Sequence, residues 1–226
     1  MKRDLFVEAE RFPLAEAFTI SRGSKTEAAV LTCTIRQGDY AGRGECVPYA
    51  RYGETLESVT AEIEAMREAV VGGLSRNELA ARMKTGAARN ALDCALWDLE
   101  AKAGGRRVAD AIGAAAPNAL TTAYTLSLGE PEAMAAQAAR HAHRPLLKVK
   151  VGTSDDVSRI AAVAEAAPRS RIILDANEGW NEDNIRRHLL AAARHGIALI
   201  EQPLPAGHDE ILRNIPHPVP ICADES

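Results

Sequence analysis

The chain has 226 residues, 46% of them hydrophobic and 26% charged, which is typical of a soluble globular protein of one or two domains. Its 27 Lys and Arg against 31 Asp and Glu leave a net charge of -4, and no run of like charges indicates a nucleic-acid partner. The apolar runs are short and the first residues turn acidic before a signal sequence could form, so we expect a cytoplasmic protein without a membrane partner.

The first half of the chain predicts an α+β domain. Three strand signals precede two amphipathic helical patterns, at 5–12, 28–36, 40–47, 56–70 and 88–103. A pair of glycines follows each helical pattern, as expected of helix ends. We assign residues 1–118 to this domain.

From residue 119 the pattern changes to short apolar strands that alternate with amphipathic helices. The predicted strands are 121–128, 146–151, 171–175, 198–201 and 219–224. The predicted helices between them are 131–143, 155–167, 182–195 and 208–213. This alternation predicts right-handed βαβ units around a parallel sheet, either a barrel or an open doubly wound sheet. No G-x-G-x-x-G follows a strand, so the dinucleotide-binding signature is missing.

Ionisable residues end four consecutive predicted strands. Lys148 and Lys150 are two residues apart on an apolar strand and therefore share one face. Asp175, Glu201 and Asp224 end the next three strands, so we expect them at the same height of the carboxyl edge. Converging carboxylates repel one another, and a hard cation, magnesium or manganese rather than zinc, relieves this repulsion. The alternative is three unrelated helix caps, a role in which Glu is poor.

A lysine pair beside a divalent ion suits the removal of a proton from a carbon next to a carboxylate. The metal would stabilise the enediolate, and Lys150 would be the base, its pKa lowered by neighbouring positive charge. Lys148 would supply that charge and neutralise a substrate oxygen. The alternative, two surface lysines on an edge strand, conflicts with the apolar residues around them.

Four motifs around these residues resemble the enolase superfamily, whose members pair a lysine base with magnesium. They are 147–152, 174–177, 200–203 and 223–226. The K-x-K form resembles the muconate-lactonizing subgroup, which implies an α+β capping domain followed by a (β/α)7β barrel. Residues 119–226 would then be the N-terminal part of that barrel, its first five strands, so the chain is expected to be truncated within it.

Within this subgroup, three segments resemble dipeptide epimerases of the L-Ala-D/L-Glu type. They are 42–54, 87–93 and 121–128. Such enzymes invert the α-carbon of the C-terminal residue of a dipeptide, which implies a small-molecule dipeptide as partner; a homo-oligomer is compatible with the sequence. The resemblance also implies one Mg²⁺ per subunit, with Mn²⁺ as the alternative, held by Asp175, Glu201 and Asp224.

The same resemblance implies roles for residues outside the metal ligands. Asn177 would support the metal shell. Lys150 and Lys148 would be catalytic, and Lys148 and Thr125 would contact the substrate. In two capping loops, Arg22 or Lys25 would pair with a substrate side-chain carboxylate, and Tyr52 would also contact the substrate.

Three alternatives remain open for the function. Two use the same site, o-succinylbenzoate synthase and N-succinylamino acid racemase. The third is a non-catalytic fragment, because the second lysine and the Asp-x-Asp motif that the resemblance implies are missing from the sequence. We therefore expect the 226-residue chain alone to be inactive. His141 and His143 form an H-x-H pair, a pattern that resembles the metal-binding pair of amidohydrolase barrels. Their position at the end of a predicted helix favours a structural role instead.

Overall fold

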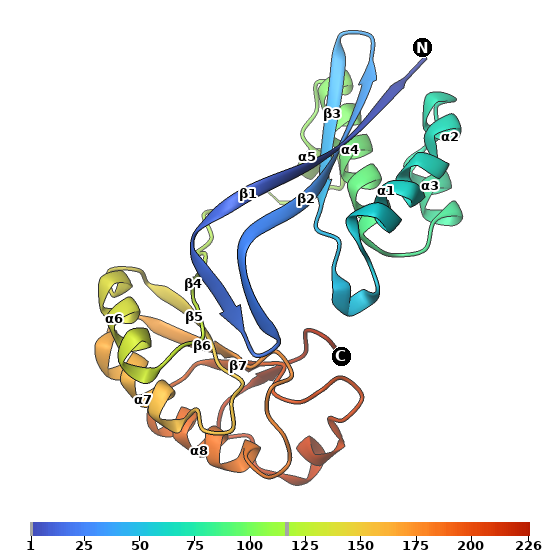
Figure 1. The fold of residues 1–226 in the computed structure, drawn as a ribbon. Coiled ribbons are helices and arrows are strands. Elements are labelled where there is room, and N and C mark those ends of the chain that lie inside the picture. Colours follow the sequence, from blue (N-terminus) through green and yellow to red (C-terminus); the bar gives the residue numbers. More distant parts are fainter. Residues whose placement is uncertain (1, 116–117) are drawn as a thin grey trace. The chain divides into compact units, whose positions relative to one another are not determined.

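The computed structural model describes residues 2–115 and 118–226, which divide into two compact units. The first consists of Met1–Pro13 and Glu27–Asn118, and the second of Leu14–Thr26 and Ala119–Ser226. Strands β1 (Asp4–Ile20) and β2 (Gly23–Gln37) each contribute residues to both units (Figure 1). The hairpin tip 14–26, which the sequence places in the first domain, makes its contacts with the second unit.

The first unit contains a three-stranded sheet in the order β1-β2-β3. β3 (Tyr40–Cys46) pairs antiparallel with β2, from Leu31 opposite Cys46 to Gln37 opposite Tyr40. Leu31, Cys33 and Ile35 of β2 belong to the core of this unit, and Val30 and Thr32 on the other face are buried as well, so this strand is more buried than the predicted half-buried one. β1 and β2 are longer than the predicted strands because they continue into the hairpin tip 14–26, whereas β3 ends one residue before its predicted end.

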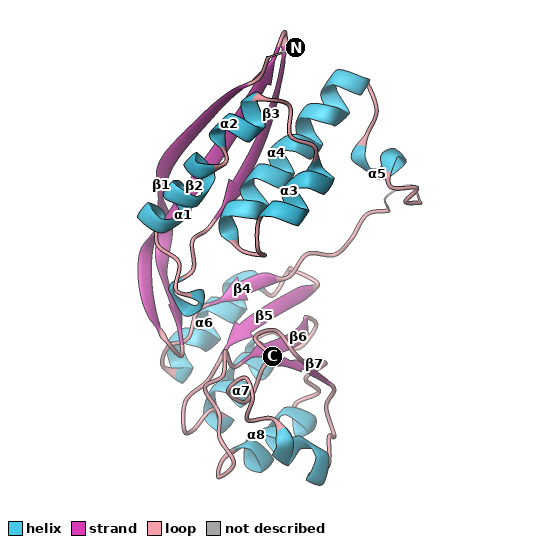
Figure 2. Ribbon diagram, turned by 90° about the vertical axis from the view of Figure 1, so that its right-hand side faces the viewer, coloured by secondary structure: helices cyan, strands magenta, loops and turns pink. Residues whose placement is uncertain are grey.

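Helices cover one face of this sheet (Figure 2). The helices of this unit are η1 (Ala50–Tyr52), α1 (Leu56–Ala65), α2 (Arg67–Val71), α3 (Arg76–Arg82), α4 (Ala87–Gly104) and α5 (Val108–Ala111). Capping boxes begin α1 and α3, and the predicted helix 56–70 is divided at Met66, whose N–H donates to Ile63 three residues earlier. α4 lies directly on β3, where a Cβ on Gly42 or Gly44 would collide with the helix backbone.

The second unit contains a five-stranded parallel sheet in the order β4-β5-β6-β7-β8. The strands are β4 (Tyr124–Leu126), β5 (Leu146–Lys150), β6 (Arg171–Asp175), β7 (Leu199–Glu201) and β8 (Ile221–Cys222). Between them run α6 (Pro131–His141), α7 (Val157–Ala166), α8 (Ile185–Arg194) and η2 (Glu210–Asn214), with α6, α7 and α8 on one side of the sheet (Figure 1). Each element lies within a segment that the sequence predicts, apart from η2, which ends one residue later.

The core of this unit lies between the sheet and its helices. It includes Leu147, Val149, Leu174 and Ile200 from the strands, all at most 1% exposed. The opposite face of β5 carries Lys148 and Lys150, so the strand alternation directs apolar side chains to the helices and lysines to the other side. In the part of the chain that the structure describes, no helix is both long enough and apolar enough to cross a membrane.

Candidate functional site

The carboxyl ends of three neighbouring strands bring the predicted ionisable residues together. Lys150 is in register with Asp175 on the next strand, and Asp175 is in register with Glu201. Lys148 and Lys150 share one face, since the ammonium groups lie 2.8 and 2.6 Å from Oδ2 of Asp175. Lys148 also donates to Oε1 of Glu201 at 2.7 Å. The structure therefore contains a compact cluster of two ammonium groups and two carboxylates.

Asp175 is the deepest member of this cluster, with 1% of its surface exposed. Burial by itself would raise the pKa of its carboxyl, but hydrogen bonds from Lys148 and Lys150 outweigh burial and lower that pKa. Its Oδ1 accepts the backbone N–H of Asn177 at 3.0 Å. The folded chain thus keeps a carboxylate ionised at a buried strand end.

Glu201 has the opposite electrostatic environment. Burial and the nearby carboxylates of Asp175 and Asp224 raise its pKa despite the hydrogen bond from Lys148. The negative potential at Glu201 is therefore only partly compensated by a single ammonium group. A further positive charge at this strand end would be favourable.

Asp224 does not lie at the height that the sequence predicts. Cys222, not Asp224, is in register with Glu201, because β8 ends at Cys222. The backbone N–H groups of 224–226 then turn to donate to Oε1 of Gln202, at 2.9 to 3.2 Å. The side chain of Asp224 is exposed beyond the end of the strand.

The next feature is whether the carboxylates of this cluster are arranged to hold a metal ion. Among the residues that the structure describes, no three His, Cys, Asp or Glu side chains form a group ready to hold a metal ion. The Lys148 ammonium group bridges Asp175 and Glu201, and so occupies a position that attracts positive charge. Adjacent carboxylate oxygens and the raised pKa of Glu201 suit a hard divalent cation once that ammonium group withdraws. The oxygen-only chemistry of Asp175 and Glu201 fits magnesium, while Asp224 lies outside this pair.

Asn177 contacts the candidate base. Its Oδ1 accepts from Lys150 Nζ at 2.9 Å, and its Nδ2 donates to Glu225 at 3.4 Å. Asn177 has a φ of 43° and the next residue, Glu178, a φ of 67°. Left-handed backbone at non-glycine residues is costly and is concentrated at functional sites, in agreement with a site at the end of β6.

Arg22 lies at the hairpin tip and is paired with residues of the same unit. Its guanidinium donates to the backbone oxygen of Asn177 at 2.8 Å and to the carboxylates of Glu178 and Glu225, both at 2.9 Å. Ser21 donates to the same Asn177 oxygen. The sequence singles out Arg22 as a substrate contact, but neither acid partner carries a periodic signal that would predict this pairing.

The other two predicted substrate contacts lie in different surroundings. Thr125 is in register with Lys148 and lines a cavity of about 630 Å³, together with Phe18, Lys25 and other residues of 14–18, β4 and α6. Tyr52 belongs to the first unit, is 65% exposed, and has its ring 6.2 Å from that of Tyr49. Its role in substrate binding stays a prediction.

The fold and this strand-end cluster can be compared with known protein families. Residues 2–113 match the mandelate racemase/muconate lactonizing enzyme N-terminal domain, and residues 132–226 match the enolase C-terminal domain-like family. The chain belongs to this family of the enolase superfamily. The predicted family and fold, a capping domain with the first parallel strands of a barrel, are therefore confirmed.

Two individual relatives show which members of the family this chain is similar to. The L-Ala-D/L-Glu epimerase of Escherichia coli (strain K12) is 43% identical over 226 residues, which are 99% of this chain and 70% of that protein. The N-acetyl-D-glutamate racemase of Pseudoalteromonas is 40% identical over 87% of this chain and 63% of its own length. These relatives are isomerases, as the sequence predicts for this chain.

Solved structures show the same likeness. An enolase family member from Agrobacterium tumefaciens with homology to dipeptide epimerases, solved with sodium and L-Ala-L-Glu, is 60% identical with a TM-score of 0.97. The alignment covers 99% of this chain and 69% of that one. The dipeptide epimerase of Enterococcus faecalis V583, complexed with Mg and L-Leu-L-Tyr, is 29% identical with a TM-score of 0.89, over 100% of this chain and 68% of its own.

Proposed function

We propose that the protein epimerises dipeptides of the L-Ala-D/L-Glu type, in a magnesium-dependent reaction that removes the α-proton next to a carboxylate. The observation that carries this proposal is the cluster of Lys148, Lys150, Asp175 and Glu201 on three adjacent strand ends. The names of the relatives and the dipeptides in the related structures support the substrate class.

Lys150 is the proposed base. It is 8% exposed, its Nζ donates to Asp175 and Asn177, and the ring of Phe18 lies 5.8 Å from Nζ. The Asn177 oxygen fixes the direction of the amine, and the Phe18 ring limits the access of water. Because Lys150 is an ammonium group paired with Asp175 in this structure, it must first release a proton. The neutral amine can then accept a proton from a carbon placed above the strand ends.

Lys148 has a different proposed role. Hydrogen bonds to Asp175 and Glu201 raise its pKa although burial would lower it, so this lysine keeps its proton. A permanent ammonium group beside Lys150 neutralises a substrate oxygen. Asp175 and Glu201 would hold Mg²⁺, or Mn²⁺ as the alternative. Asp224, which lies beyond the strand end but acts on the pKa of Glu201, would be the third ligand. The bound ion would supply positive charge to the oxygens of the enediolate.

Arg22 and Thr125 are the proposed substrate contacts on either side of this cluster. A side-chain carboxylate on the substrate would replace Glu178 or Glu225 as a partner of Arg22, at no loss of ion pairing for the guanidinium. Thr125, in register with Lys148, would offer a hydroxyl at the first strand. The Arg22 contact favours an acidic dipeptide.

A second candidate is racemisation of an N-acylated amino acid, favoured by the 40% identity to the N-acetyl-D-glutamate racemase. It uses the same base and the same carboxylate chemistry. The two substrate classes differ at the amino end, which is a free ammonium group in a dipeptide and an acyl group in the alternative.

The test follows the α-proton by NMR in deuterated buffer with Mg²⁺, on the protein expressed from its complete reading frame. L-Ala-L-Glu should lose the α-proton signal of its glutamate residue, and Lys150→Ala should slow this loss about a thousandfold for one of the two epimers, L-Ala-L-Glu or L-Ala-D-Glu. Lys84→Ala, which removes a lysine with an 80% exposed side chain, is the control. Exchange at the unmodified rate in Lys150→Ala would contradict the proposal, and exchange with N-acetylglutamate alone would favour the second candidate.

The chain 1–226 tested by itself should not invert the dipeptide. Inversion requires an acid on the face opposite the base, whereas Lys148 and Lys150 lie on one strand and one face.

A further inference from the structure

A second cluster of buried polar groups surrounds Asp156, on the helix that follows the lysine strand. Asp156 is 0% exposed and occupies the N-cap position of α7. An Asp at this position normally accepts from backbone N–H groups of its own helix, but the Asp156 side chain makes no such bond. Its carboxylate is directed elsewhere.

The carboxylate joins two strand-end loops. Oδ2 accepts from the backbone N–H groups of Gly152 and Thr153, at 2.8 and 2.9 Å, and from Nε1 of Trp180 at 2.7 Å. Oδ1 accepts from the Thr153 hydroxyl at 2.7 Å and lies 3.7 Å from Arg159. Gly152 and Thr153 follow the strand of Lys150, whereas Trp180 follows the strand of Asp175. One buried side chain therefore holds both loops.

A third element joins at His188 on α8. The backbone N–H of Asp156 donates to Nε2 of His188 at 3.1 Å, so this nitrogen is an unprotonated acceptor. His188 is 0% exposed, and its ring lies 4.6 Å from that of Trp180. The cluster places neutral donors and one guanidinium around a single buried carboxylate, so the loss of a donor would leave that carboxylate less well satisfied.

The two loops also touch without space between them. A Cβ on Gly179 would lie 2.5 Å from Cα of Gly152, and a Cβ on Gly152 would collide with the backbone oxygen of Ala176. Gly152 is two residues after Lys150, and Gly179 is two residues after Asn177, which bonds to Lys150. A displacement of one loop must therefore move the other, and with it the contacts of the proposed base.

We propose that Asp156 is a positioning residue, which sets the place of Lys150 and Asn177 through the backbone of these two loops. It does not touch the substrate. Its catalytic consequence rests on the proposed function, whereas its control of the loops does not.

Asp156→Asn tests this inference, because the amide keeps the volume but places an NH₂ group among donors. The reporters are the amides of 178–180, which donate to backbone oxygens at 2.9 Å and are therefore protected. Hydrogen exchange measured by mass spectrometry should be about tenfold faster for these amides in the variant. Mg²⁺ titrated alone by calorimetry should bind more weakly. In protein that exchanges the α-proton of L-Ala-L-Glu, kcat should fall with KM nearly unchanged.

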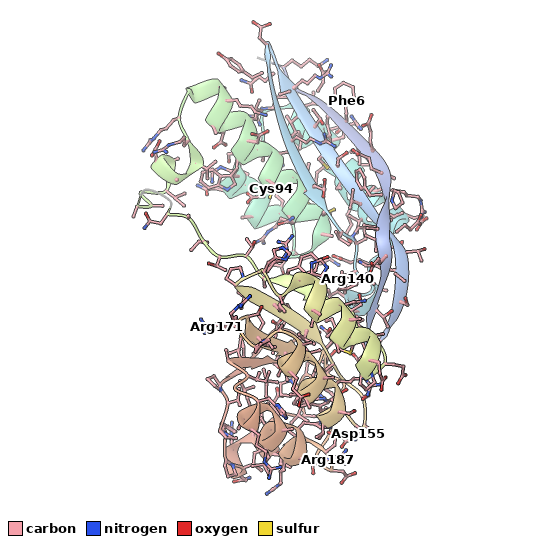
Figure 3. The ribbon with its side chains drawn as sticks, turned by 90° about the vertical axis from the view of Figure 1, so that its left-hand side faces the viewer. Phe6, Cys94, Arg140, Asp155, Arg171 and Arg187 are labelled. Atoms are coloured by element: carbon pink, nitrogen blue, oxygen red, sulfur yellow. The ribbon has the colours of Figure 1, made fainter. Side chains whose placement is uncertain are left out.

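The neighbouring residue supplies a matched control. Asp155 is 65% exposed and pairs with Arg187 at 3.6 Å, and Figure 3 shows both on the surface of the second unit. Asp155→Asn makes the same chemical change and should leave exchange at 178–180 unaltered. Trp180→Phe removes one donor to Asp156 and keeps an aromatic ring, so it tests the inference if Asp156→Asn fails to fold.

The outcomes separate this inference from the proposed function. Faster exchange at 178–180 in Asp156→Asn or Trp180→Phe, but not in Asp155→Asn, supports the positioning role even if no dipeptide reacts. Exchange at the unmodified rate in both variants overturns it, even if the dipeptide is epimerised. A rise in KM with unchanged kcat would also overturn it, because it would place Asp156 in substrate binding.

Discussion

The strand ends of the second unit and the helix–sheet contact of the first unit are equally buried but are held together in different ways. Asp175 is 1% exposed and its pKa is lowered, because two ammonium groups outweigh the effect of burial. Cys33 is 0% exposed in the first unit, and burial, followed by the charges of Cys46 and Glu64, raises its pKa to about 12. Buried charge is thus favoured where cationic partners are built in, and suppressed where the surroundings are apolar.

The two regions also differ in how much change they tolerate. Around Gly42 and Gly44, helix α4 and strand β3 touch through backbone atoms, so no side chain can move to relieve a clash. At the strand ends, Lys148 has a long flexible side chain that can exchange partners. The first region is suited to rigidity, and the second to binding a ligand or an ion.

The reactivity of cysteines gives the largest expected contrast. With a pKa of about 12 against an ordinary 9.0, Cys33 should carry about a thousandfold less thiolate at pH 8 than a free thiol. Cys94 and Cys222 are exposed. A thiol reagent followed by mass spectrometry should modify these two first and Cys33 only on unfolding. Fast labelling of Cys33 in the folded chain would contradict the expected effect of burial on its thiol.

Substitution of Gly44 tests the rigidity of the first region. A Cβ there would lie 2.6 Å from the Ala95 nitrogen and even closer to the Ala91 oxygen, so Gly44→Ala should lower the free energy of unfolding by about 3 kcal/mol. Gly104→Ala, at the end of the same helix in open space, should be neutral or stabilising by up to about 1 kcal/mol. Urea denaturation measures both. Equal effects would show that the α4 contact is not close-packed.

Removal of a charge tests the second region. Asp175→Asn should weaken Mg²⁺ binding by about tenfold or more, because it removes a negative oxygen from the proposed hard-cation site. Asp183→Asn, at an exposed loop position, is the matched control and should bind as the unmodified chain does. Calorimetric titration decides between them. Equal affinity in Asp175→Asn would mean that Asp175 serves only to pair the two lysines.

The protonation of His188 should make a smaller contribution, which is seen in how stability depends on pH. Burial lowers its pKa below the ordinary 6.5, so the unfolded chain takes up its proton at a higher pH than the folded chain does. Stability should therefore fall as the pH drops from about 6.5 towards the lowered value. His188→Gln should reduce this acid dependence, whereas exposed His217→Gln should not. Denaturation midpoints at pH 7 and pH 5 provide the measurement.

Local periodicity accounts for what could be predicted of the fold. The spacing of apolar residues located β5 and β6 almost to the residue, and the two-residue period placed Lys148 and Lys150 on one face. Lys150, Asp175 and Glu201 are each separated by one strand–helix unit. This spacing correctly predicted that they lie side by side at the ends of neighbouring strands. The same spacing was wrong for the height of Asp224, because it does not show where β8 ends.

Short-range spacing and local motifs were sufficient to predict the family, the order of the elements and the acidic and basic residues at the ends of β5, β6 and β7. The partners of these residues depend on the tertiary structure. Arg22 meets Glu225 across 203 positions of the chain, and Asp156 meets His188 across 32. Such pairs have no period that a sequence pattern can carry, since they are set by how loops at the ends of different strands close against one another.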